Sequence, residues 1–95
     1  MTASVFIRHK VNDFAPWKKV YNEGVAMRTE VGVLADSVHR DPDDPNTIIV
    51  YNQYADLSTA QEAMAAMRSS EEWQSVLKKA GVKPETIEMW VGEDV

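Results

Sequence analysis

Residues 41–54 decide the fold, because a strong turn there leads straight into the most β-favouring segment of the chain: Asp41-Pro42-Asp43-Asp44-Pro45-Asn46-Thr47-Ile48-Ile49-Val50-Tyr51-Asn52-Gln53-Tyr54. The first part, residues 41–46, consists of residue types that break strands and favour turns. The second part, residues 47–54, has a core of β-branched and aromatic side chains. Residues 33–40 carry another strand pattern before the turn, so the two segments predict an antiparallel hairpin.

A strand and a helix are expected upstream of this hairpin. Residues 4–11 alternate between two faces, and one of the faces collects Val5, Ile7, His9 and Val11. The period becomes helical from residue 14 to residue 31, and Gly32 is the expected C-terminal stop. This helix would run back along the strands.

A second helix and a last strand are expected downstream of the hairpin. Ser58 with Gln61 forms a capping-box pattern that predicts the start of the helix. The same kind of pattern recurs from Ser69, which predicts an interruption and a restart, and Gly81 ends the helix. Residues 86–91 alternate again and predict a final strand.

The resulting order is strand, helix, strand, strand, helix, strand, which is the split βαβ arrangement of ferredoxin-like α+β domains. We expect residues 1–95 to form one such domain, with a four-stranded antiparallel sheet and both helices on one face. The strands carry apolar residues on both faces, so the uncovered face of the sheet predicts a partner. A second copy packed face to face would complete a dimeric α/β barrel.

Composition excludes several classes of function. The chain has 95 residues, no cysteine and a net charge of −5. Without cysteine there is neither a disulfide framework nor a thiolate metal site, which suits a cytoplasmic location. A nucleic-acid-binding domain needs a basic stripe, and two short lysine pairs do not form one. No apolar run approaches the length of a membrane span. We therefore expect a cytoplasmic protein that binds neither nucleic acid nor membrane.

A family resemblance rests on Arg8 to Phe14 followed by Trp17, on Arg28 before Gly32, and on three later segments, Asp41–Asn46, Ala55–Leu57 and Ala80–Val82. These segments resemble the dimeric α/β-barrel superfamily, which includes the antibiotic biosynthesis monooxygenases and related cyclase-like and stress-responsive proteins. The resemblance covers nearly the whole chain. It implies a homodimer that is either a cofactor-independent monooxygenase- or cyclase-like enzyme for a small organic molecule, or a non-catalytic small-molecule-binding or stress-related protein.

His9 and Tyr51 are the candidate catalytic residues. Cyclases in this superfamily use histidines and a tyrosine as acid–base groups in a pocket between helices and sheet, and the resemblance implies that role for His9. Tyr51, or Tyr21 in its place, would supply the second group. The alternative is a strand-end histidine that only hydrogen-bonds a neighbour. A metal site is not expected, because His39 would lie roughly 9–10 Å from His9, two strand spacings away.

Four further side chains, Trp17, Tyr21, Arg28 and Asn52, are candidate ligand-binding residues. Aromatic side chains at helical spacing are core residues far more often than substrate contacts, so we expect these two to belong to the core. Arg28 would either hold the carboxylate or phenolate of a small ligand or turn outward to the last helical carbonyls, and we expect the outward position. A buried Asn52 would either steady an oxyanion or bridge the dimer interface, and we expect the interface. Gly24 indicates close approach to the sheet or room for a ligand.

These candidates fall at two ends of the predicted sheet. His9 and Trp17 should lie near one end, and Arg28, Asn52 and Tyr54 near the other, because the first helix runs back along the strands. A pocket that used both His9 and Arg28 would span most of the domain, so we expect a site at one end only, with the His9 end preferred. A cavity reached by either residue would favour an enzyme, whereas a filled core would favour a binding or structural protein.

Overall fold

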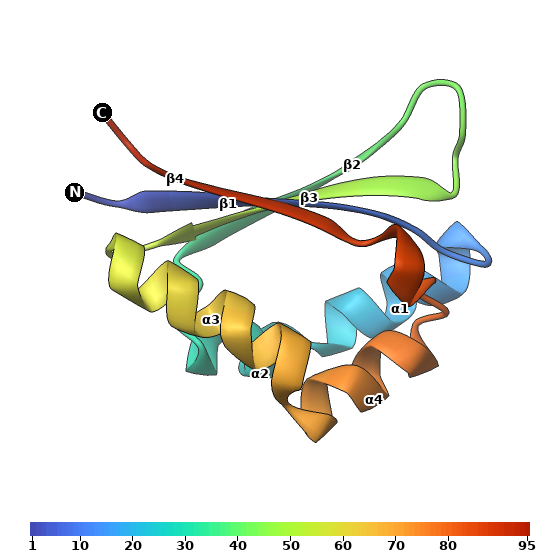
Figure 1. Cartoon of the computed structure of the whole chain (residues 1–95). Helices are drawn as coiled ribbons and strands as arrows, with labels where there is room; N and C mark the ends of the chain where they lie inside the picture. The colour runs from blue at the N-terminus through green and yellow to red at the C-terminus, as the bar shows by residue number, and fades with distance from the viewer.

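The protein is a four-stranded antiparallel sheet with all of its helices on one face, as the computed structural model of residues 1–95 shows (Figure 1). The elements in chain order are β1 (Ala3–Lys10), α1 (Phe14–Glu23), α2 (Val25–Glu30), β2 (Ala35–Arg40), β3 (Thr47–Tyr54), α3 (Leu57–Ser69), α4 (Glu71–Lys79), the 3₁₀ turn Pro84–Thr86 and β4 (Glu88–Glu93). This is the ferredoxin-like α+β fold that the pattern predicts.

The strands lie side by side in the order β2-β3-β1-β4, and every neighbouring pair is antiparallel. The register pairs His9 with Ile48, Ile7 with Val50 and Val5 with Asn52. Directly paired residues share a face of a sheet. The alternate positions of β1 and β3 that the sequence assigns to one face therefore meet beneath the helices.

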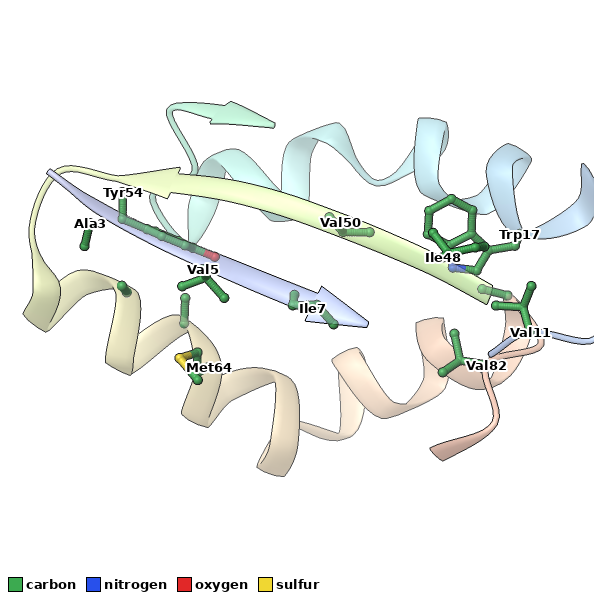
Figure 2. Close-up of a cluster of buried hydrophobic side chains, with 13 residues drawn as sticks. Ala3, Val5, Ile7, Val11, Trp17, Ile48, Val50, Tyr54, Met64 and Val82 are labelled. Carbon is green, nitrogen blue, oxygen red and sulfur yellow. The ribbon is translucent and has the colours of Figure 1, made fainter. Parts of the chain in front are cut away.

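The core fills the space between the sheet and the helix layer (Figure 2). Each long central strand contributes alternate side chains to it. The α3 helix adds small or flexible side chains that allow a close approach, whereas α1 adds the large Trp17 ring. The buried hydrophobic residues are Ala3, Val5, Ile7, Val11, Trp17, Ile48, Val50, Tyr54, Ala60, Ala63, Met64, Ala80 and Val82. None of the helices combines the length and the apolar composition that a membrane crossing requires.

The helices differ in detail from the sequence expectation. The predicted continuous helix over residues 14–31 is interrupted at Gly24, whose N–H donates to the Tyr21 carbonyl and closes a tight turn between α1 and α2. The next helix begins at Leu57 rather than at Ser58. Its N-cap is Asp56, because this carboxylate accepts the Thr59 N–H at 2.7 Å.

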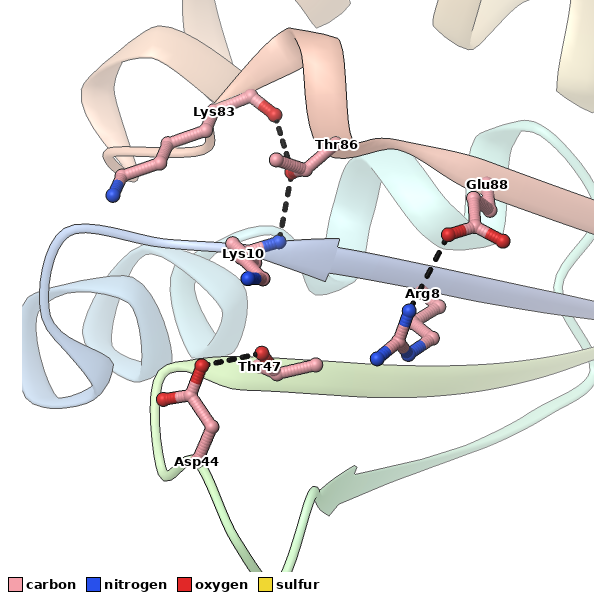
Figure 3. A network of polar contacts seen from close by, with 7 residues as sticks. All are labelled: Arg8, Lys10, Asp44, Thr47, Lys83, Thr86 and Glu88. Atoms are coloured by element: carbon pink, nitrogen blue, oxygen red, sulfur yellow. Dashed lines mark hydrogen bonds and ion pairs between the residues drawn. The ribbon is translucent and has the colours of Figure 1, made fainter.

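The end of the sheet that carries His9 is fixed by polar contacts (Figure 3). The Lys10 N–H donates to the Thr86 hydroxyl at 2.9 Å, and that hydroxyl donates to the Lys83 carbonyl at 2.6 Å. The turn Pro84–Thr86 occupies the place where the last strand was expected to begin, so β4 runs over Glu88–Glu93 instead of residues 86–91. These contacts join the C-terminal segment to the end of β1.

Candidate functional site

A cavity of about 370 Å³ lies between the sheet and the helices. Its floor comes from β1 and β3, and its walls come from α1 and α2 on one side and from α3, α4 and the last strand on the other. The space exists because α1 packs against α4 while α2 makes no contact with α3. Seventeen of the twenty-four lining residues are hydrophobic, and none is an Asp or a Glu. The cavity is therefore an apolar chamber with a few polar groups.

His9 lies on the cavity side of β1 near the end of the strand, and only 5% of it is exposed. Its ring contacts Trp17 with a centroid separation of 5.7 Å, and Nε2 has no hydrogen-bond partner. Burial lowers the pKa of His9 to about 4, because the apolar surroundings disfavour the charged imidazolium. At neutral pH the ring is therefore uncharged, and its Nε2 is buried without a hydrogen-bond partner.

An aromatic wall connects His9 to Arg28. Trp17 is buried and stacks on Tyr21, with centroids 5.0 Å apart and an angle of 22° between the rings. The Tyr21 hydroxyl donates to Asp36 on β2. Burial and that hydrogen bond both raise the pKa of Tyr21, whereas the positive charge of Arg28 opposes the rise. Tyr21 is consequently a neutral, oriented ring in the wall of the cavity.

Arg28 folds inward, so the expectation that it turns outward was wrong. Its guanidinium carbon lies 3.8 Å from the centre of the Tyr21 ring, and its side chain is only 13% exposed. One terminal nitrogen, Nη1, donates to the Tyr21 carbonyl at 2.6 Å, which satisfies a carbonyl at the end of α1. The cation–π contact and this hydrogen bond keep the side chain along the cavity wall.

Asn52 and Tyr54 are buried polar groups on the cavity side of β3. They are 4% and 0% exposed, and neither the Asn52 carbonyl oxygen nor the Tyr54 hydroxyl has a hydrogen-bond partner. Burial raises the pKa of Tyr54, because the surroundings disfavour the charged phenolate. The expectation that Asn52 bridges the dimer interface was wrong, because Gln53 is the residue that faces the open side of the sheet.

Tyr51 is not brought together with His9. It lies on the opposite face of the sheet, where its ring is 5.4 Å from that of Phe6. The single chain therefore offers Tyr21 and Tyr54, rather than Tyr51, to the cavity. His39 is exposed on β2 and contacts the Ser37 hydroxyl. No group of three His, Cys, Asp or Glu side chains is arranged to hold a metal ion.

The two predicted clusters line the same cavity. The His9–Ile48 and Val5–Asn52 pairs are four residues apart along β1, which corresponds to about 14 Å at roughly 3.4 Å per residue. Arg28 lies at the Asn52 end, because its partner Asp36 pairs directly with Asn52 in the sheet. A pocket that reaches both His9 and Arg28 therefore exists and extends along most of the sheet. The expectation that a site uses only one of the two ends stays a prediction.

The profile of the antibiotic biosynthesis monooxygenase family matches residues 3–79, which include the whole sheet except β4 and nearly all of the helices. The chain belongs to this family. The match bears out the family resemblance seen in the sequence. No curated protein matches the chain.

Solved structures show the same fold at low sequence identity. The cofactor-independent oxygenase SnoaB from Streptomyces nogalater superposes with a TM-score of 0.74 at 13% identity, covering 99% of this chain and 93% of its own. A protein from Bordetella bronchiseptica assigned to the antibiotic biosynthesis monooxygenases gives 0.77 at 13% identity, with coverage of 99% and 97%. An ethyl tert-butyl ether (EthD) family protein from Bacillus halodurans gives 0.61 at 18% identity over both whole chains.

Sequence reasoning placed Tyr54 near Arg28 but did not select it as a site residue. The signal was present, because the alternation of residues 48, 50, 52 and 54 assigns Tyr54 to the same face as Asn52. Arg68 and Gln74 also line the cavity from α3 and α4 and were not singled out. Their helical positions alone do not distinguish the cavity rim from solvent.

Proposed function

We propose that this family member is a cofactor-independent monooxygenase for a small, planar aromatic compound. The observation that carries the proposal is the apolar cavity with an uncharged His9 whose Nε2 has no partner in the chain. A dry cavity reached by an acid–base group is what such a reaction needs. The structural likeness to a cofactor-independent oxygenase from Streptomyces nogalater supports the reaction class.

The reaction that fits these groups is the oxidation of a ring methylene group (CH₂) with an acidic C–H bond to a carbonyl group. His9 takes a proton from the substrate, and the resulting carbanion gives electrons to dioxygen while a carbon–oxygen bond forms. Loss of water completes the balance, so that R₂CH₂ and O₂ give R₂C=O and H₂O. The substrate is oxidised by four electrons, and dioxygen is reduced by the same four. The substrate anion lies beside His9 after the proton transfer, and its negative charge stabilises the protonated His9 ring.

The remaining cavity residues have roles in binding. Trp17 and Tyr21 would lie against the faces of an aromatic substrate, where stacked rings are favourable. The Asn52 amide would donate to a substrate oxygen that gains charge during the reaction. A cytoplasmic location and a homodimer that buries the open face of the sheet complete the proposal.

Turnover of simple test substrates checks this function. Anthrone and an anthrone carboxylic acid should be converted to the corresponding anthraquinones faster with protein than in buffer, and labelled dioxygen should supply the new carbonyl oxygen. His9→Phe should lower the rate about a hundredfold, which is typical for the loss of a general base. His39→Gln is the matched control and should retain the rate.

Two outcomes would reject the enzyme proposal. One is binding of these compounds without any rate above that of buffer, which would favour the non-catalytic ligand-binding alternative. The other is a His9→Phe variant that oxidises anthrone as fast as the wild type, which would remove the proposed base.

A further inference from the structure

Arg28 is a mostly buried cation whose hydrogen-bonding capacity is largely unused. A guanidinium carries five N–H donors, and the chain provides one hydrogen bond, from Nη1 to the Tyr21 carbonyl. The ion pair with Asp36 is long, with 3.9 Å between Nε and Oδ2, and Asp36 is 37% exposed and already accepts the Tyr21 hydroxyl. A contact of that length is outside hydrogen-bond range. Arg28 therefore retains donors for another acceptor.

The residues around Arg28 hold its guanidinium group in place. The Tyr21 carbonyl holds one end of the guanidinium, and the Tyr21 ring supports its face. Gly24 leaves the necessary room, because a Cβ there would lie 3.1 Å from Arg28 Nη1. The sequence left open whether Gly24 approaches the sheet or makes room for a ligand. In the structure, the space beside Gly24 is occupied by the Arg28 side chain.

The surroundings of Arg28 favour a negatively charged ligand. Asn52 and Tyr54 lie at the same end of the cavity, are at least nine-tenths buried and have polar atoms without partners. A buried polar group without a partner costs stability, and a ligand oxygen would accept a hydrogen bond from the Tyr54 hydroxyl. The Asn52 amide nitrogen can also donate to such an oxygen, although the unpaired Asn52 carbonyl oxygen cannot, because it only accepts. No acidic side chain lines the cavity, although the chain as a whole carries a net charge of −5.

We propose that this end of the cavity is a carboxylate subsite, and that the natural ligand is an aromatic carboxylic acid. The carboxylate accepts hydrogen bonds from Arg28 and from the Tyr54 hydroxyl, while the rings extend along the apolar cavity towards His9. Arg28 is then the residue that determines specificity for charge. The inference rests on the proposed use of the cavity as a substrate site, but not on the oxidation step.

Paired binding measurements test the subsite. Calorimetry compares naphthoate with naphthamide, its neutral amide with the same ring position, at neutral pH. The wild type should prefer naphthoate, and Arg28→Met should weaken naphthoate about tenfold to a hundredfold, the usual range for a hydrogen bond to a charged group. Binding of naphthamide should change little, because it depends on the rings and on the apolar wall.

Two further variants separate a role in binding from a role in folding. Gly24→Ala keeps the arginine, and the backbone angles of Gly24 suit alanine, so the fold should be retained. The added methyl should crowd Arg28 Nη1, shift the guanidinium slightly and reduce the preference for naphthoate. Arg40→Met is the matched control, because Arg40 also lies over an aromatic ring, that of Phe14 at 4.4 Å, but outside the cavity. It should leave both affinities unchanged.

The proposal is overturned if the wild type does not prefer naphthoate, or if Arg28→Met weakens both ligands equally. It stands if the preference is present and lost with Arg28, even where anthrone compounds are not oxidised. In that case the subsite holds and the proposed oxygenase activity fails. The binding measurements therefore test the carboxylate subsite, and the turnover measurements test the oxygenase activity.

Discussion

At the scale of the residue, burial decides the chemistry of the candidate site. Strand alternation turns His9 inward, and the apolar side chains around it keep the ring uncharged. The same alternation buries Asn52 and Tyr54 and leaves them without partners. Arg28 is held inward by its contacts with the carbonyl and ring of Tyr21 and by the room that Gly24 leaves.

The shifted pKa of His9 predicts a pH-dependent stability. The pKa is about 4 in the folded protein against an ordinary value of 6.5, so the unfolded chain takes up the proton first as the pH falls. The stabilisation that depends on an uncharged His9 is present at neutral pH and is lost between about pH 7 and pH 4. The loss amounts to about 3 kcal/mol, at roughly 1.36 kcal/mol for each pKa unit.

Urea unfolding of the wild type and of His9→Phe across this range measures the effect. The difference in unfolding free energy between the two proteins should change with pH from 7 to 4 and level off below 4. His39→Gln is the control, because His39 is exposed, and it should follow the wild type. A constant difference between wild type and His9→Phe would contradict the assigned burial effect.

At the scale of the element, glycines and caps set where the helices end. Gly32 follows α2 with a φ of +95°, a left-handed conformation that side chains disfavour, and it ends the helical segment as the sequence predicts. Asp56 rather than Ser58 caps α3, because helix caps depend on the backbone angle of the residue before the first turn. Local sequence patterns therefore predicted where the helices lie more accurately than the residues at which they begin and end.

Gly32→Ala should destabilise the protein. The left-handed angle costs a residue with a Cβ about 1–2 kcal/mol, and the added Cβ would also lie only 2.8 Å from Thr59 Cγ2. Urea unfolding checks this, with Gly92→Ala as the control, because a Cβ added at Gly92 would meet nothing within 4 Å and Gly92 has no positive φ. Equal stability of Gly32→Ala and wild type would show that the turn tolerates a side chain.

At the scale of the whole molecule, the helices cover only one face of the sheet. On the open face, Tyr51, Phe6 and Trp90 form one row across three strands, because Phe6 pairs with both of the others. Phe6 is 45% exposed and Trp90 is 51% exposed. An exposed apolar row of this kind is typical of an interaction surface, and a second copy would bury it.

Trp90→Glu should therefore convert the proposed homodimer into a monomer, because a buried charge without a partner opposes association. Sedimentation velocity measures the change. Val25→Glu is the control, because Val25 is an exposed apolar residue on the helix side and should not affect assembly. A wild type that sediments as a monomer at high concentration would contradict the dimer.

The sequence by itself determined the order of the elements, the faces of the strands and the family resemblance. These features follow from periodicity and from turn residues, which are local properties of the chain. Only the tertiary structure decided that one cavity joins His9 to Arg28, that Tyr51 points away from it, and that Asn52 and Tyr54 lack partners. A space between elements depends on how segments distant in sequence pack, and here α1 meets α4 while α2 and α3 remain apart.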